Sequence, residues 1–174
     1  PPRSTLFPYT TLFRSHPMLF TNNIERSIDD KHRLSIPTEM RCGFAVGSGP
    51  SVVYASPGAA GCICLWPEAT FEALSNSLDN SLLPDEDEME FEQILFSQSK
   101  RLEIDKAGRI RLPESLLEFA GIKSQAVVIG VRDHLEIRDP DQWKTSLEEK
   151  LPKLQQILAR ARSRRRAGKG GNNE

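Results

Sequence analysis

The sequence has few of the features that usually reveal a protein's chemistry. No apolar run approaches the roughly 20 residues that a membrane-spanning helix needs, so no membrane partner is expected. Three cysteines in 174 residues form no disulfide framework, and an odd count fits a reducing cytoplasm. A glycine-rich phosphate loop, a serine nucleophile elbow and a paired-histidine motif are all absent. We therefore expect no enzymatic activity, no small-molecule substrate and no cofactor.

The charge balance excludes a uniformly basic protein. The net charge is −1, so any surface that binds nucleic acid must be local. The composition is 38% hydrophobic and 27% charged, which is typical of a globular chain with a modest core. Small units of this kind often need a partner to bury their apolar faces, so a homo-oligomer is expected.

One short pattern occurs twice. Residues 28–37 read IDDKHRLSIP and residues 104–113 read IDKAGRIRLP, so an apolar residue, Asp, Arg and Pro recur at the same offset of 76 residues. This offset indicates an internal repeat. In each copy the Asp and the following triplet favour a tight turn, and the alternating residues after it favour a short strand that ends at proline.

The repeated pattern resembles the two signature loops of the MraZ family. Two later segments, CLWPE at 64–68 and EIRDPDQW at 136–143, resemble the matching ends of that family's two domains. The resemblance implies a mainly β (α+β) fold, in which two tandem β-β-α-β-β units of the SpoVT-AbrB type pair as a swapped-hairpin double barrel with peripheral helices. It also implies a cytoplasmic, nucleoid-associated regulator that assembles into rings.

The expected domain organisation follows from the repeat and from composition. Residues 1–17 resemble a translated sequencing adaptor rather than a natural leader, so the natural start is expected at Met18. The full division is an artefactual leader at 1–17, a first SpoVT-AbrB-like domain at 18–70, a helical and acidic linker at 71–98, a second such domain at 99–143, and a C-terminal helix with a disordered basic tail at 144–174.

Several local elements can be predicted from turn and capping residues. A short helical turn is expected after Pro37 with Thr38 as its N-cap. The β-rich runs 52–54 and 62–66 suggest a hairpin with a long connection. Pro152 is expected to interrupt the C-terminal helix, whose apolar stripe suits packing within the chain or against a neighbour.

The functional hypothesis places the basic residues of both loops against DNA. A cation held on a structured turn can neutralise phosphate or reach the acceptor edge of guanine. The competing interpretation is that each Arg only pairs with its own Asp and braces the turn; the two roles are compatible. The expected DNA-binding residues are Lys31, Arg33, Lys106, Arg109 and Arg111. The expected loop-positioning residues are Asp29, Asp105 and Gly108.

His32 stands where the second copy has Gly108. If this position requires a positive φ, His carries a modest strain there, although it tolerates that region better than most residues. The shape of the first loop is therefore harder to predict than that of the second.

Other candidate sites have weaker support. Cys62 and Cys64 face the same way on a strand, but a zinc site usually needs four ligands, so buried thiols and no metal are expected. His134 has Asp133 and Glu136 near it in sequence, but neighbouring residues on a strand face opposite sides. We therefore expect no catalytic group there.

Two functional hypotheses remain. By resemblance, the chain is a sequence-specific transcriptional regulator, usually a repressor, that binds promoter direct repeats of double-stranded DNA upstream of the division and cell-wall gene cluster. The alternative is a structural assembly protein that contacts nucleic acid only through its basic tail.

Overall fold

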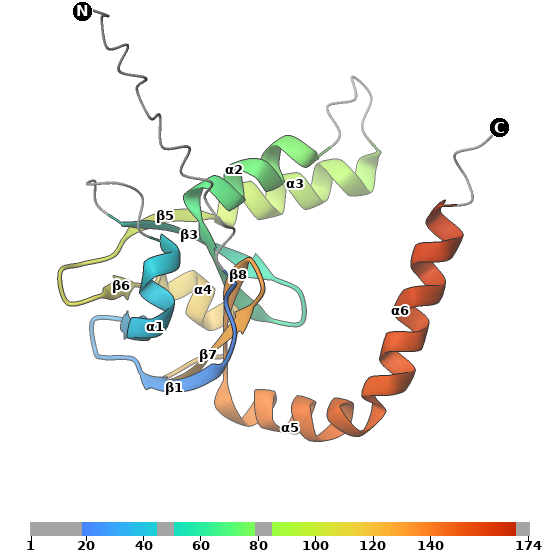
Figure 1. Ribbon diagram of the computed structural model, residues 1–174. Coiled ribbons are helices and arrows are strands. Elements are labelled where there is room, and N and C mark those ends of the chain that lie inside the picture. Colours follow the sequence, from blue (N-terminus) through green and yellow to red (C-terminus); the bar gives the residue numbers. More distant parts are fainter. Residues whose placement is uncertain (1–18, 45–50, 79–84, 170–174) are drawn as a thin grey trace, which may run out of the picture.

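The computed structural model describes residues 19–44, 51–78 and 85–169, and it is mainly β (Figure 1). The strands are β1 (Asn23–Ser27), β2 (Arg33–Ser35), β3 (Val52–Gly58), β4 (Cys62–Pro67), β5 (Lys100–Glu103), β6 (Arg109–Arg111), β7 (Gln125–Val131) and β8 (His134–Arg138). The α-helices are α1 (Thr38–Arg41), α2 (Glu68–Ser77), α3 (Glu86–Gln98), α4 (Glu114–Phe119), α5 (Pro140–Lys150) and α6 (Leu154–Lys169). Two 3-10 turns, η1 (Cys42–Phe44) and η2 (Leu151–Lys153), complete the set. The expected leader, including Met18, lies outside the described residues.

The strands of the two sequence repeats are interleaved. One antiparallel sheet has the order β1-β7-β8-β4-β3-β5, and β2 and β6 form a separate two-stranded ribbon. The first-half strand β1 pairs with β7, and β3 pairs with β5, so each half supplies a partner to the other. The expected exchange of strands between the repeats is therefore present.

The mainly β class is confirmed, but the expected closed barrel is wrong. Among the described residues, β1 and β5 are the two edges of an open six-stranded sheet. β2 and β6 pair with each other outside this sheet, and an isolated bridge between Ile28 and Leu34 connects β2 to the segment that follows β1.

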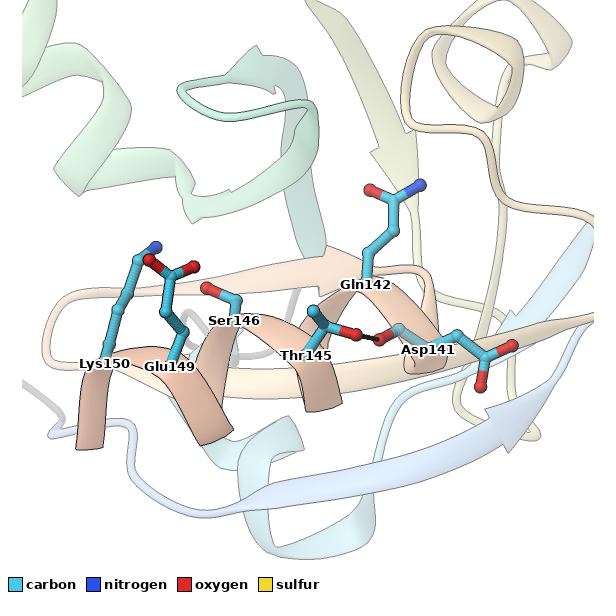
Figure 2. A pocket seen from close by; sticks show the side chains of 6 residues that line it. All are labelled: Asp141, Gln142, Thr145, Ser146, Glu149 and Lys150. Carbon is cyan, nitrogen blue, oxygen red and sulfur yellow. Dashed lines mark hydrogen bonds between the residues drawn. The ribbon is translucent and has the colours of Figure 1, made fainter. Parts of the chain in front are cut away.

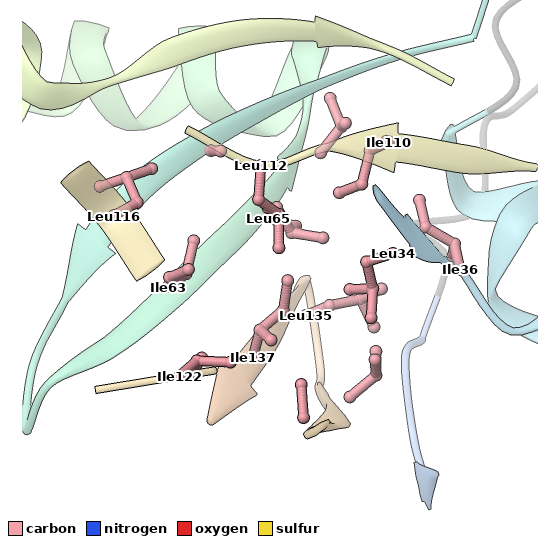
Figure 3. Close-up of a cluster of buried hydrophobic side chains, with 14 of the residues drawn as sticks. Leu34, Ile36, Ile63, Leu65, Ile110, Leu112, Leu116, Ile122, Leu135 and Ile137 are labelled. Carbon is pink, nitrogen blue, oxygen red and sulfur yellow. The ribbon is translucent and has the colours of Figure 1, made fainter. Parts of the chain in front are cut away.

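The core lies between the sheet, the ribbon and the short helices α1 and α4 (Figure 3). Alternation along the short strands decides which side chains enter it. Leu34 on β2 and Ile110 on β6 are opposite each other and almost completely buried. Ile63 and Leu65 on β4 meet Leu135 on β8 from the sheet side. The predicted period-2 pattern of the repeat is therefore confirmed.

Three local expectations need correction. The turn between β3 and β4 spans only residues 59–61, because Pro57 and Gly58 remain in the strand. The N-cap of α1 is Pro37, and Thr38 is inside the helix with no side-chain cap. The basic segment from 159 to 169 continues α6 and is not disordered over that range, since its Ala- and Arg-rich sequence has high helix propensity.

The peripheral helices attach at two places. α2 and α3 lie over the β3–β5 end of the sheet, where Phe71 stacks on Tyr54 at 4.7 Å and meets the edge of Phe96 at 6.0 Å between ring centroids (Figure 1). α5 and α6 extend away from the sheet on the other side. As predicted, the helix is interrupted at Pro152, within η2. No helix in the described ranges is long and apolar enough to cross a membrane.

The ribbon core gives a stability prediction. Replacing Leu34, which is fully buried, with Ala should lower the free energy of unfolding by about 2–5 kcal/mol, because a cavity remains at the centre of the ribbon contact. Urea unfolding followed by circular dichroism measures this change. Leu19→Ala is the matched control, since Leu19 is 65% exposed, and it should change little. Equal costs for the two substitutions would contradict the assigned core.

Candidate nucleic-acid interface

The first loop is built around the carboxylate of Asp29. Its Oδ1 accepts hydrogen bonds from the backbone N–H groups of Lys31 (3.0 Å) and Arg33 (2.9 Å). Its Oδ2 accepts from the Arg33 side chain through Nε and Nη2, both at 2.7 Å. The backbone closes the turn because the His32 N–H donates to the Asp29 carbonyl. One carboxylate thus holds both the loop backbone and the Arg that follows it.

The second loop repeats this arrangement. Asp105 Oδ1 accepts from the N–H groups of Ala107 and Arg109, both at 2.9 Å. Its Oδ2 accepts from Nε and Nη2 of Arg109, also at 2.9 Å. Gly108 N–H donates to the Asp105 carbonyl at 2.8 Å. The two copies therefore share a geometry as well as a sequence pattern.

The β2–β6 ribbon joins the two loops. Its register pairs Arg33 with Arg111 and Ser35 with Arg109, and these four side chains lie on the face opposite Leu34 and Ile110. Further hydrogen bonds at the ends run from the Ile36 N–H to the Gly108 carbonyl and from the Leu112 N–H to the His32 carbonyl, each 2.9 Å. The loops project from the same side of the molecule in Figure 1. The outer face of the ribbon therefore carries three arginines between two braced turns.

The charges of the loops are mutually stabilised. The hydrogen bond from the Arg33 side chain lowers the pKa of Asp29 to about 2. The backbone N–H of Arg109 is the first cause that lowers the pKa of Asp105, and the side chain of the same residue adds to it. The pKa of Arg33 is raised, first by its bond to Asp29 and further by the charge of Asp105. The carboxylate of one loop therefore acts on the cation of the other.

Arg41 on α1 connects the two copies, and the sequence did not reveal it. Its Nε donates to the Ile36 carbonyl at 2.7 Å, and its Nη2 lies 3.2 Å from Ser35 Oγ. The guanidinium then fills the space where a Cβ at Gly108 would lie. Gly108 also has φ +77°, a conformation that glycine adopts without strain, so two independent features favour glycine at this position. In the sequence, the only sign of this contact was a basic residue shortly after the predicted strand of the first repeat.

The equivalent contact in the first loop is different. His32 has φ +59°, so the position of Gly108 requires left-handed backbone in both copies and His accepts it with some strain. At the offset of the repeat, Leu117 on α4 corresponds to Arg41. His32 and Leu117 line a cavity of about 390 Å³. One loop thus has a glycine under an arginine, and the other has a histidine beside a leucine.

The structure brings most of the predicted site residues together. Asp29, Asp105 and Gly108 make the loop contacts expected of positioning residues. Lys31 and Lys106 are exposed at the tips of the turns, and the side chains of Arg33 and Arg109 remain 34% and 37% exposed while paired with Asp. Whether these cations touch nucleic acid stays a prediction.

Two other candidate sites, on α5 and at Asp133 and His134, have less support than the loops. A shallow depression along α5 is lined by polar side chains of that one helix, with Thr145 Oγ1 donating to the Asp141 carbonyl (Figure 2). The sequence argument that separated Asp133 from His134 is wrong, because Asp133 lies in the turn before β8 and its Oδ1 is 2.9 Å from His134 Nδ1. No convergent cavity accompanies either place among the described residues.

The loop electrostatics give a pH prediction. The pKa of Asp29 lies below its ordinary value of 3.8, so its carboxylate stabilises the folded loop above that value, and this contribution is lost as the pH falls toward 2. A carboxyl carbon NMR titration should show a midpoint near 2 for Asp29. In Arg33→Ala the midpoint should move back toward 3.8. A wild-type midpoint near 3.8 would contradict the bidentate pair.

The glycine contact gives a second prediction. Gly61→Ala should cost about 1–2 kcal/mol of stability, because its φ is positive but nothing lies within 4 Å of the new methyl group. Gly108→Ala should cost more, because the methyl group must also displace the Arg41 guanidinium and break its hydrogen bonds to Ile36 and Ser35. Chemical denaturation measures both, and Gly61→Ala is the control. If the two substitutions cost the same, Arg41 does not occupy the assigned position.

Comparison with known proteins agrees with the duplicated loops. The family model of the MraZ protein matches residues 95–165, which include the second loop. A protein of Thermomicrobium roseum named transcriptional regulator MraZ is 32% identical over 130 residues, covering 75% of this chain and 88% of the relative. The protein of that name in Pelotomaculum thermopropionicum is 36% identical over 126 residues, covering 72% and 83%. The one in Mesoplasma florum is 29% identical over 140 residues, covering 80% and 93%.

These alignments extend over nearly the whole length of the relatives and include both halves of the interleaved fold. The identity of 32% over 88% of a relative is more than a shared loop motif would give. The chain belongs to the MraZ family.

Proposed function

We propose that the chain is a DNA-binding transcriptional regulator whose DNA-binding face is the β2–β6 ribbon with its two flanking loops. The observation that carries the proposal is the duplicated, Asp-braced turn on each side of one arginine-rich ribbon face. The names of the relatives support a role in transcription. The relatives' name also favours a non-enzymatic role.

The geometry suits an extended polyanion. The major groove of DNA admits a two-stranded β-ribbon, and arginine is well suited to guanine edges and phosphates. Arg33, Arg109 and Arg111 supply side chains from the ribbon face, while Lys31 and Lys106 extend the charge to the loop tips. Because Asp29 and Asp105 fix the loops beforehand, little conformational entropy is lost on binding. Bracing and DNA contact are thus two roles of the same arginines.

The finer target follows from the family resemblance. We propose that the chain represses the division and cell-wall gene cluster by binding promoter direct repeats, in a cytoplasmic, nucleoid-associated assembly of identical subunits, expected to be a ring. Exposed apolar side chains support the assembly, and they are found on α3 (Met89, Phe91, Ile94 and Phe96) and along α5 to α6 (Leu147, Leu151, Leu154 and Leu158). Repeats spaced about 10 base pairs apart would present equivalent contacts on one side of the duplex. Several weak contacts would then act together.

The alternative places nucleic-acid contact on α6 instead of the loops. Arg160 and Arg162 are exposed on this helix, which extends away from the ribbon (Figure 1). A basic helix of this kind binds phosphate without reading bases. The chain would then be an assembly protein with only nonspecific affinity for nucleic acid.

A binding titration separates the two proposals. The chain from Met18 onward is titrated against duplexes with and without spaced direct repeats, at two salt concentrations. The variant Lys31→Ala/Lys106→Ala/Arg111→Ala should lose about tenfold or more in affinity for the repeats and show a smaller salt slope, because phosphate contacts are removed. This variant leaves both Asp–Arg pairs in place, so the fold should not change. Lys144→Ala on α5 is the matched control and should bind as the wild type does.

Two further variants complete this test. Arg33→Ala/Arg109→Ala should also lose repeat binding, and circular dichroism reports whether it remains folded. Ending the chain after Leu158 should reduce nonspecific binding while preference for the repeats remains. If truncation abolishes that preference and the loop variants keep it, the loops are not the readout surface and the assembly-protein proposal is favoured.

A further inference from the structure

The face of β4 that points away from the core carries an unusual set of side chains. Ile63 and Leu65 enter the core, so the alternating residues Cys62, Cys64 and Trp66 lie on the other face. In the register with β8, Cys64 is opposite Glu136. The neighbouring residues on the same face of β8 are His134 and Arg138. Two thiols, a carboxylate and an imidazole thus lie together on the face of the sheet opposite the core.

The separation of the two thiols matches that of metal ligands. Cys62 Sγ and Cys64 Sγ are 3.9 Å apart, and both cysteines are buried. Two sulfur atoms that each lie about 2.3 Å from a tetrahedral zinc ion are roughly 3.8 Å apart. The strand therefore holds the thiols at the required spacing before any ion binds.

Glu136 supplies a third donor. One oxygen of its carboxylate and the two sulfur atoms all lie within 4.8 Å of one another. Its Oε2 accepts a hydrogen bond from Arg138 Nε at 2.8 Å. This bond orients the carboxylate and leaves Oε1 as the oxygen available to an ion. This residue is 72 positions beyond Cys64 in the chain, so counting nearby ligands in the sequence could not find it.

His134 is suitably placed to complete the site. Its Nδ1 is 2.9 Å from Asp133 Oδ1, and its Nε2 lies 3.8 Å from Glu136 Oε1. Nε2 therefore points at the carboxylate that supplies the third donor. Stacking on Trp66, at 4.0 Å between ring centroids, restricts the ring further. The fourth ligand is then either this imidazole, after a small side-chain shift, or water.

The charges and the space also fit an ion. Two thiolates and Glu136 carry three negative charges, which a divalent cation and Arg138 balance. Without an ion, the two thiols hydrogen-bond to each other at 3.9 Å. Gly58 lies opposite Cys62 in the register, and a Cβ there would overlap both sulfur atoms. The absence of a side chain at Gly58 therefore leaves space for the two sulfur atoms.

We propose that Cys62, Cys64 and Glu136 form a binding site for a thiolate-preferring divalent cation, of which zinc is the representative. Binding displaces one proton from each thiol, so affinity falls as the pH is lowered. The ion links β4 of the first repeat to β8 of the second.

Cobalt titration tests the proposal on the full-length, reduced, metal-free chain. Cobalt bound by thiolates gives a sulfur-to-metal absorption band, which zinc should then abolish by displacement. The wild type should saturate at one ion per chain. Cys64→Ser should lose the band, and Cys42→Ser should keep it, because Cys42 is exposed on a different segment.

A second variant covers the case in which Cys64→Ser does not fold. Glu136→Gln keeps the shape of the side chain and should weaken cobalt binding by about tenfold or more. Zinc should also raise the melting temperature of the wild type by more than that of Glu136→Gln at the same zinc concentration. A folded, reduced wild type without the absorption band overturns the proposal. Equal affinity of the wild type and Glu136→Gln also overturns it.

Discussion

The pairing of Leu34 with Ile110 is the contact around which the rest of the molecule is arranged. These two residues are opposite each other in the β2–β6 ribbon and nearly inaccessible to solvent. Since the ribbon is antiparallel, this single register places the two loops at its opposite ends and turns every ribbon arginine outward. A shift by one residue would bury the arginines and expose the core face. Core packing therefore fixes the spacing of the charged surface.

The two copies have diverged around this common centre. Each needs left-handed backbone at the third residue after its Asp, and each satisfies that need differently. In the second copy a glycine accommodates Arg41, whereas in the first copy His32 borders a cavity beside Leu117. The two loops thus share a backbone conformation but differ in the side chains around it. A binding partner would meet one face with two unequal ends.

The sequence was informative where neighbouring residues determine the structure. The turn at Asp29, the alternation of Leu34 with arginine, and the break at Pro152 all follow from residues a few positions apart. Contacts between distant residues were not predictable in this way. Arg41 reaches Gly108, and Glu136 meets Cys64, only because strands from the two repeats pair.

Some errors have a similar origin. Resemblance suggested a closed barrel, but hydrogen bonding of the ribbon to the sheet depends on local strand length, which the repeat pattern does not specify. The tail was expected to be disordered from its charge, whereas α6 continues to Lys169 because its residues favour helix. Composition alone could not decide between a disordered tail and a continued helix.

The interleaving of strands also affects how the chain folds during synthesis. The partner of Asn23 in the sheet is Ile129, and the partner of Leu34 is Ile110, so the first half has no complete sheet of its own. While a ribosome is still adding residues before β7, the first repeat exposes strand edges and apolar faces that its own half cannot cover. Closure then requires long loops to form first, which makes folding slow for a chain of this size. During that interval the unpaired strand edges of the nascent chain are open to pairing with neighbouring chains.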